Sequence, residues 1–280
     1  MILITGSSGF IGSFILDYLK NKKIKCFGVD KKYNNYLRLK NFEKVNLLNK
    51  KKLSKIFKKI KPKYVIHLAA ESGLNKCHKN RVKAYKNNVE STFNLLDLAE
   101  KNNCKNILIA SSFAVDKFEI TPSFYGFTKK TCEAMSISFK KNFNMNIATL
   151  KFSNVFGPFS KHKSSAVHQM IKCMLKKKIF NLHGSGKQKR DFIYVEDLTK
   201  KILKIIKKKK FKSFYKINSQ KNTSLLDIIN VLNSFKFTKI RIKKTLAPDG
   251  YDIKTDNSKS FISKNLIKNL KKTVNWYNSN

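Results

Sequence analysis

The chain has 280 residues, with 60 Lys and Arg against 17 Asp and Glu and a formal net charge of +43. This length can bury a substantial core, and it suits one large α/β domain or a nucleotide domain that carries a smaller lobe. The charge comes almost entirely from lysines spread along the whole sequence, whereas specific readers of nucleic acid favour arginine, so we expect a solvated basic surface and no specific nucleic-acid partner.

The beginning of the chain is apolar and is followed by glycines, with no basic leader and no stretch long enough to span a bilayer. We therefore expect a cytoplasmic protein without a membrane partner. Five scattered cysteines without a C-x-x-C pair predict reduced thiols, not a disulfide framework. The histidines lack metal-ligand spacing, so no metal is expected, and His67, at the end of a predicted strand, is interpreted as a packed residue.

Short β-branched runs alternate with longer amphipathic stretches, which is the order of βαβ units that build a parallel sheet. Strands are predicted at residues 2–5, 25–29, 64–67, 106–110 and 147–151, and helices at 10–21, 51–61, 85–103 and 124–143. Right-handed crossovers then bring the carboxyl ends of the strands to one edge of the sheet, where ligands bind.

The pattern loosens after about residue 155. Helices are predicted at residues 166–177, 195–207, 225–234 and 266–277, with a glycine turn at 184–186. We therefore expect a doubly wound parallel α/β domain at 1–155 and a smaller C-terminal lobe over 156–280, some of whose segments return to the first domain.

A glycine-rich segment joins the first predicted strand to the first predicted helix. Gly6, Gly9 and Gly12 have the spacing G-x-x-G-x-x-G. Gly6 permits the tight turn, Gly9 lets the backbone approach a pyrophosphate, and Gly12 lets the helix pack closely on the sheet. The helix that begins with Phe10 and Ile11 offers N–H groups and a positive dipole end to phosphates. The segment predicts a Rossmann-type NAD(P) site.

An acidic residue, Asp30, stands at the end of the second predicted strand. A carboxylate at this place holds the ribose hydroxyls of NAD and repels the 2′-phosphate of NADP. Lys31 and Lys32 follow and soften that repulsion. The sequence therefore favours NAD over NADP as the cofactor.

Tyr125 and Lys129 lie four residues apart, on one face of a predicted helix. A phenol has a pKa of about 10, and an adjacent cation favours the phenolate and lowers that pKa. Such a pair exchanges a proton with a substrate hydroxyl. Ser111 and Ser112 end the preceding strand at the ligand edge, where a hydroxyl reaches the same substrate oxygen. In a chain this rich in lysine, the Tyr-Lys spacing alone is weak evidence.

Together, the glycine spacing, Ser112 and the Tyr125/Lys129 pair resemble the extended short-chain dehydrogenase/reductase family, specifically its NAD-dependent epimerase/dehydratase branch, which acts on nucleotide sugars. Further matches extend the resemblance over nearly the whole chain. They are His67-Leu68-Ala69-Ala70, Asn87-Asn88-Val89 with Thr92, Asn154-Val155-Phe156-Gly157-Pro158, and the segment from Gly184 to Asp197 that contains Arg190.

The sequence also departs from the family pattern. Asn46 stands where the family has an Asp near the adenine, Lys151 replaces an Arg, and Asn75 and Cys77 replace an Arg and a Ser. The stretch between Ser112 and the catalytic tyrosine is shorter than usual by roughly ten residues, which predicts a more open pocket or one that a partner subunit completes.

The resemblance implies a role for each matching residue. Ser112, Asn154 and Arg190 would bind the sugar nucleotide, with the Arg190 guanidinium on the diphosphate, and Ser112, Tyr125 and Lys129 would be catalytic. The C-terminal lobe would bind the substrate, and the predicted helices at 85–103 and 124–143 would form a homodimer. The cofactor would contact Gly6, Gly9, Phe10, Ile11, Gly12, Asp30, Asn46, Leu47, Leu68, Ala69, Ala70, Asn88, Ser111, Tyr125 and Lys129.

The resemblance also narrows the reaction. Dehydratases and decarboxylases of the family carry acidic residues just after the position of Ser112, where this chain has Phe113 and Ala114. The expected function is therefore epimerisation of a nucleoside-diphosphate sugar by transient oxidation at C4. The alternatives are a 4-keto-sugar-nucleotide reductase that uses NAD(P)H, a dehydratase, and a noncatalytic NAD(P)-binding regulator.

Overall fold

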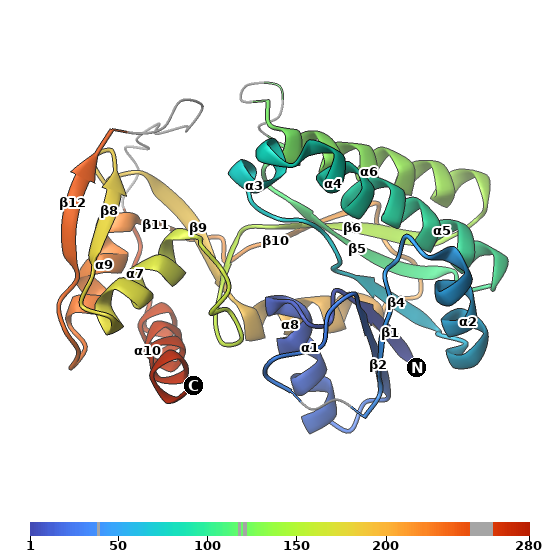
Figure 1. The fold of residues 1–280 in the computed structure, drawn as a ribbon, viewed down its shortest axis with the longest axis horizontal. Helices are drawn as coiled ribbons and strands as arrows, with labels where there is room; N and C mark the ends of the chain where they lie inside the picture. Colours follow the sequence, from blue (N-terminus) through green and yellow to red (C-terminus); the bar gives the residue numbers. More distant parts are fainter. Residues whose placement is uncertain (38–39, 117–118, 120–121, 247–259) are drawn as a thin grey trace. The chain divides into compact units, whose positions relative to one another are not determined.

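A computed structural model describes residues 1–280 except 38, 39, 117, 118, 120, 121 and 247–259. Chain contacts divide it into two units (Figure 1). The first contains Met1–Phe152 and Thr199–Ile217, and the second contains Ser153–Leu198 and Asn218–Asn280.

The first unit is built on a seven-stranded sheet in which every pairing is parallel. Its order is β10-β6-β5-β4-β1-β2-β3, so the order reverses between β1 and β4, and the carboxyl ends of these strands form the ligand edge. The strands are β1 (Ile2–Thr5), β2 (Cys26–Asp30), β3 (Phe42–Lys44), β4 (Tyr64–His67), β5 (Asn106–Ser112), β6 (Asn146–Phe152) and β10 (Phe214–Ile217). The predicted doubly wound parallel sheet is confirmed.

Helices cover both faces of this sheet (Figure 1). One face carries α1 (Phe10–Asn21) and the first-unit part of α8 (Val195–Ile206), and the other carries α2 (Lys50–Ile60), α5 (Ser91–Lys101) and α6 (Phe124–Asn142). The core on the second face joins alternate strand residues to fully buried side chains of α2 and α5, and Met135 and Phe139 of α6 pack against it. This alternation follows from the two-residue period of the strands.

The predicted helix at 85–103 is wrong in its start and continuity. The structure has α3 (Leu74–Lys79), α4 (Arg81–Tyr85) and a π-helical turn, η1 (Lys86–Glu90), before α5. In this turn a backbone carbonyl, that of Asn88, accepts hydrogen bonds from side chains. The donors are Thr92 Oγ1 (2.5 Å) and Cys132 Sγ (3.2 Å). Such turns are frequent at functional sites, and the helical pattern of the sequence does not reveal them.

The described residues of the second unit form two small sheets, the helices α7, α9 and α10, and the first residues of α8. In one sheet β9 pairs in parallel with β7 and antiparallel with β11, and in the other β8 pairs in parallel with β12. The elements are β7 (Asn154–Phe156), α7 (Ala166–Leu175), β8 (Ile179–His183), β9 (Lys189–Tyr194), β11 (Asn222–Ser224), α9 (Leu225–Asn233), β12 (Arg241–Thr245) and α10 (Lys264–Ser279). No helix in the described part of the chain is long and apolar enough to cross a lipid bilayer.

Candidate active site

The glycine loop between β1 and α1 is a backbone cradle that only glycine can form. Gly6 has a φ of +69°, and a Cβ added there would lie 2.6 Å from the Ala69 backbone nitrogen. A Cβ added at Gly12 would lie 2.2 Å from the Gly6 carbonyl oxygen. Gly9 precedes α1, so no side chain caps the helix that points its N-terminus at the loop. The loop therefore fits a dinucleotide pyrophosphate.

Asp30, at the end of β2, is tied to this loop. Its carboxylate accepts hydrogen bonds from the backbone N–H of Ser8 (3.0 Å) and of Lys32 (3.1 Å). Burial raises the pKa of the Asp30 carboxyl, and these backbone hydrogen bonds oppose that effect. The residue is in place to accept from ribose hydroxyls, and it also fixes the shape of the loop.

Other predicted cofactor residues lie near the ends of neighbouring strands. Leu68 and Ala69 follow β4, and their N–H groups donate to the Thr5 carbonyl (3.2 Å) and hydroxyl (3.4 Å). Asn46 is exposed, and its side chain accepts from the Leu48 N–H (3.1 Å). The side-chain oxygen of Asn46 thus already accepts a hydrogen bond from a neighbouring residue. The side chain also lacks the negative charge of the Asp expected at this position.

Three predicted catalytic residues meet at the carboxyl end of β5. Ser112 ends that strand, and its side chain is hydrogen-bonded to the phenol of Tyr125 in the first turn of α6. Lys129, one turn further, is only 6 % exposed and donates its ammonium to the Ala110 carbonyl (2.8 Å). Ser123 caps α6 by accepting from the Gly126 N–H (3.0 Å), which fixes the start of the helix that carries the pair.

The prediction that Lys129 lowers the pKa of Tyr125 is wrong for the protein alone. Burial raises the pKa of the Tyr125 phenol to about 12, and the hydrogen bond with Ser112 offsets only part of this effect. The Lys129 ammonium is instead held by a backbone carbonyl. Burial lowers the pKa of Lys129, while the nearby Glu133 carboxylate favours its charged form.

His67, at the end of β4, is a packed residue, as expected from the sequence. It is 2 % exposed, and its two ring nitrogens lie 2.7 Å from Thr5 Oγ1 and 2.9 Å from Thr92 Oγ1. Burial, aided by the charge of Lys129, lowers the pKa of His67 to about 3, so the ring is neutral at physiological pH.

Asn88 joins the π-helical turn to the catalytic helix. Its side chain accepts from the Glu71 N–H (2.6 Å) and donates to the Glu71 carbonyl (3.1 Å) and to Thr128 Oγ1 (3.0 Å). Both polar side-chain atoms of Asn88 therefore have protein partners. Through them Asn88 joins the loop after β4 to Thr128, the residue next to Lys129 on α6.

The two remaining predicted substrate residues, Asn154 and Arg190, belong to the second unit. They lie on the paired strands β7 and β9, in which Asn154 is opposite Phe192. The Asn154 amide donates to the Asp191 carbonyl (3.1 Å), and the Arg190 guanidinium donates to the Lys189 carbonyl (2.9 Å). The structure thus brings these two residues onto one small sheet, and it gathers Ser112, Tyr125 and Lys129 in the first unit.

Sequence reasoning missed a group of charged residues beside the catalytic pair. Glu133, buried on α6, accepts from Ser111 Oγ (2.5 Å), and its other carboxylate oxygen lies 3.5 Å from the Lys151 ammonium. Lys151 also donates to Asp116 (2.5 Å). The one signal in the sequence was the position of Glu133, four residues after Lys129 and therefore on the same helical face.

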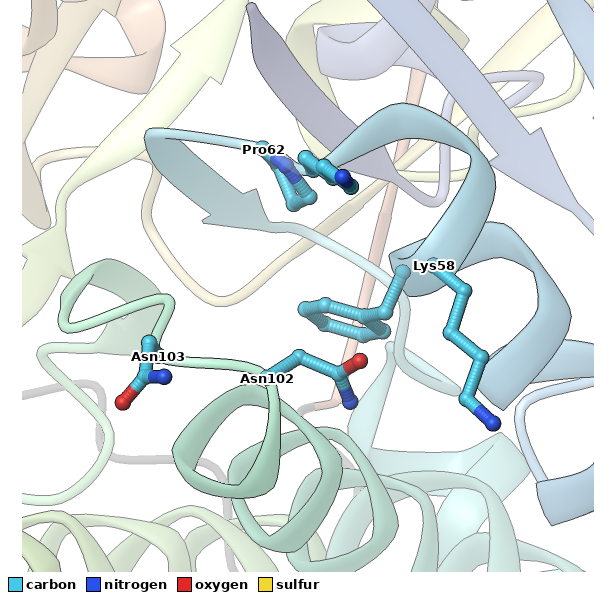
Figure 2. Close-up of a pocket in the computed structure, with 6 residues that line it drawn as sticks. Lys58, Pro62, Asn102 and Asn103 are labelled. Atoms are coloured by element: carbon cyan, nitrogen blue, oxygen red, sulfur yellow. The ribbon is translucent and has the colours of Figure 1, made fainter.

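A separate pocket, shown in Figure 2, lies at the opposite edge of the sheet. Lys58 and Lys61 at the end of α2, Pro62 before β4, and Asn102 and Asn103 before β5 line it together with Phe57. Because it lies at the amino ends of β4 and β5, it is distinct from the ligand edge that holds the glycine loop and Tyr125.

A family model described as the NAD dependent epimerase/dehydratase family matches residues 2–218. The chain belongs to this family. The match includes the glycine loop, the Ser112/Tyr125/Lys129 group, Asn154 and Arg190. The chain is therefore related to enzymes that use NAD.

Named relatives include both epimerases and dehydratases. The chain is 26% identical to a UDP-glucuronate 4-epimerase of Thermodesulfobacterium geofontis over 99% of this chain and 96% of the relative. It is 28% identical to a dTDP-D-glucose 4,6-dehydratase of Dictyostelium discoideum over 81% of this chain and 60% of the relative. Among solved structures, a UDP-glucuronic acid 4-epimerase from Bacillus cereus, in complex with UDP-glucuronic acid and NAD, has a TM-score of 0.84 at 25% identity and covers 99% of each chain.

Proposed function

We propose that the protein is an NAD-dependent epimerase that inverts C4 of a nucleoside-diphosphate sugar by transient oxidation. One observation carries this proposal: Ser112 ends β5 and Tyr125 lies in the first turn of α6, while the buried Lys129 ammonium, one turn further along α6, donates to the Ala110 carbonyl of the same strand. The glycine cradle lies at the same edge of the same sheet.

Each predicted site residue of the first unit named below has a role in the proposed reaction. The glycine loop and the α1 N-terminus hold the pyrophosphate, and Asp30 accepts from the ribose. Tyr125 takes the proton of the C4 hydroxyl and later returns it, while Ser112 donates to the same sugar oxygen. NAD, when bound, supplies a hydride acceptor and a positive charge that lowers the pKa of a neighbouring phenol.

Asn154 and Arg190 are proposed to bind the sugar nucleotide, with Arg190 on the diphosphate, because a guanidinium matches phosphate in charge and geometry. The named relatives act on UDP-glucuronate or dTDP-glucose. A substrate panel should therefore contain neutral hexoses and hexuronates on both nucleotides.

The turn after Ser112 favours epimerisation over dehydration. Phe113 and Ala114 offer no acid or base, and the carboxylate of Asp116, further along the same turn, is paired with Lys151 (2.5 Å). Elimination of water needs an additional acid and base beside the sugar. A 4-keto-sugar reductase would use the same Ser112, Tyr125 and Lys129, so it stays the second candidate.

A homodimer is also proposed, through the helices of one face of the first unit. Exposed apolar side chains gather on these helices: Val82 and Tyr85 on α4, Phe93 on α5, and Phe127 on α6, with Phe143 at the end of α6. A second copy of this surface would cover them, as in an isologous two-fold interface.

The test is turnover of a sugar-nucleotide panel with substoichiometric NAD, followed by NMR of the anomeric and C4 protons. We expect C4 epimers without net consumption of cofactor. Tyr125→Phe should keep the affinity for NAD and lower kcat by roughly 10²–10⁴-fold, whereas Tyr64→Phe, at the amino end of β4, should be active. Stoichiometric NAD(P)H oxidation with a 4-keto sugar, and no epimer from any hydroxy sugar, would identify a reductase.

A further inference from the structure

We propose that Lys151 is a positioning residue of the active site: its ammonium clamps Asp116, in the turn after Ser112, to Glu133, on the helix of Tyr125 and Lys129, and so holds the Ser112 hydroxyl against the Tyr125 phenol. The expected effect on turnover rests on the proposed function. The ion pairs that form the clamp lie within the first unit and do not depend on that function.

Lys151 lies beside the catalytic strand end. It is on β6, directly opposite Ser111 of β5 in the register of the sheet, and the pairing continues past the strand because the Phe113 N–H donates to the Phe152 carbonyl (3.2 Å). The ammonium lies 5.3 Å from the ring centroid of Phe214 on the neighbouring strand β10. The Lys151 ammonium is thus placed beside the ring of Phe214, and Lys151 itself lies on the strand that pairs with the one carrying Ser111 and Ser112.

The ammonium bridges two carboxylates from different elements. It donates to Asp116 Oδ1 (2.5 Å) and lies 3.5 Å from Glu133 Oε2. The side chains of Lys151 and Glu133 are only 15 % and 8 % exposed, against 35 % for Asp116. Burial lowers the pKa of Lys151, but the two carboxylates together outweigh burial and raise it, so the bridge is charged at neutral pH.

The turn from Ser112 to Asp116 links this bridge to the reacting group. The Ala114 N–H donates to the Ser112 hydroxyl oxygen (3.2 Å), and the Val115 N–H donates to the Ser112 carbonyl (3.1 Å). These bonds orient the hydroxyl of Ser112, which is hydrogen-bonded to Tyr125. A clamp on Asp116 therefore acts on the Ser112 side of that hydrogen bond.

The Glu133 end of the bridge acts on the other side. Glu133 lies four residues after Lys129 and eight after Tyr125 on α6, and it accepts from the Ser111 hydroxyl (2.5 Å). Lys151 therefore connects the strand end and its turn to the helix that carries the phenol. Since a small misplacement of reacting groups lowers rates strongly, a clamp on both sides of the Ser112–Tyr125 hydrogen bond affects catalysis without contact with substrate.

The first experiment is a double-mutant cycle on kcat. Lys151→Met keeps an unbranched side chain of similar length and removes the charge. We expect kcat to fall roughly 10- to 100-fold with unchanged NAD affinity, and Lys151→Arg to restore most of it. In a Ser112→Ala background, Lys151→Met should have no further effect, because the hydroxyl that it positions is gone. Lys101→Met, which breaks the surface pair with Asp97 (2.8 Å), is the matched control and should leave kcat unchanged.

The second experiment needs no turnover. In the cofactor-free protein labelled with ¹³C at tyrosine Cζ, the Tyr125 signal is the one lost in Tyr125→Phe. Lys151→Met should shift this signal in the same direction as Ser112→Ala. If the wild-type enzyme turns over no substrate, the proposed function fails while this measurement still decides the clamp.

Two results would overturn the proposal: a Tyr125 signal that Lys151→Met leaves in place, or a loss of kcat that is equal in both backgrounds. Either would make Lys151 a merely structural residue. Asp116→Asn cuts the same bridge at its more exposed end and should reproduce both signatures, so it replaces Lys151→Met if that variant does not fold.

Discussion

His67 makes the stability of the first unit depend on pH in a way that can be calculated. Its ring is buried between the hydroxyls of Thr5 and Thr92, and burial, aided by the positive charge of Lys129, lowers its pKa from 6.5 to about 3. The unfolded chain takes up a proton at His67 below pH 6.5, whereas the folded protein does not. This contribution to stability is therefore fully present above pH 6.5 and is lost as the pH falls toward about 3.

The size of the effect follows from the linkage relation. Each pH unit in this window changes the free energy of unfolding by about 1.4 kcal/mol for one histidine. His67→Asn removes the titrating group, at the cost of a small cavity and altered hydrogen bonds that do not depend on pH. Between about pH 6.5 and pH 4.5 the wild type should therefore lose about 2.3 kcal/mol more than the variant, since the unfolded histidine is only half protonated at pH 6.5.

The assay is urea unfolding of both proteins at several pH values across this window. The difference between them is the informative quantity, because carboxylates and the buried His168, whose pKa is also lowered to about 3, contribute equally to both. Parallel stability curves for the wild type and His67→Asn would refute the reasoning, since they would mean that His67 titrates alike in the folded and unfolded chains.

Further predictions concern the cofactor, the substrate and the dimer. Gly12→Ala should abolish NAD binding and lower the free energy of unfolding by about 1–3 kcal/mol, because the added Cβ would lie 2.2 Å from a backbone oxygen. Calorimetry measures the NAD affinity and urea unfolding measures the stability. Retained NAD affinity would contradict the assignment of the glycine loop to the cofactor. Asp30→Asn keeps an acceptor for the Ser8 N–H and removes the charge, so NAD binding should weaken and NADP binding should improve in titrations, and equal losses would reject the assignment. Arg190→Ala should raise KM for the sugar nucleotide and leave NAD affinity unchanged, while a selective loss of NAD affinity would exclude a substrate role. Light scattering should show a dimer that Phe93→Glu dissociates, and a wild-type monomer at all concentrations would exclude it.

The sequence predicted most of the first unit because its signals are local. Strand composition, helical periodicity and the glycine spacing need no tertiary information, and the predicted elements other than 85–103 lie within two residues of those observed at each end. The strands β3 and β10 of the first unit and β7, β8, β9, β11 and β12 of the second were not predicted, because each is short and pairs with a strand elsewhere in the sequence. In β12, the sequence Arg-Ile-Lys-Lys-Thr also hides the alternation on which strand prediction depends.

The error on Tyr125 has a different physical origin. The four-residue spacing places Lys129 on the same face of α6 as Tyr125. The direction of its ammonium, however, depends on the backbone carbonyl of Ala110, which belongs to the strand β5. The role of Lys151 was hidden for a similar reason, since nothing local separates it from the many solvated lysines of this chain. Burial and two carboxylates from different elements make the distinction.

Lys129 connects the chemistry of the site to its stability. Its charge contributes to keeping His67 neutral, and it acts on the thiols of Cys77 and Cys132, yet burial dominates at both thiols and raises their pKa values, that of Cys77 to about 11. The ring and both thiols are therefore uncharged at neutral pH. The Lys129 ammonium is held by the Ala110 carbonyl and by the field of Glu133. The charge that the proposed reaction needs is thus also, after burial, the second cause that lowers the pKa of His67 and makes the folded state sensitive to acid.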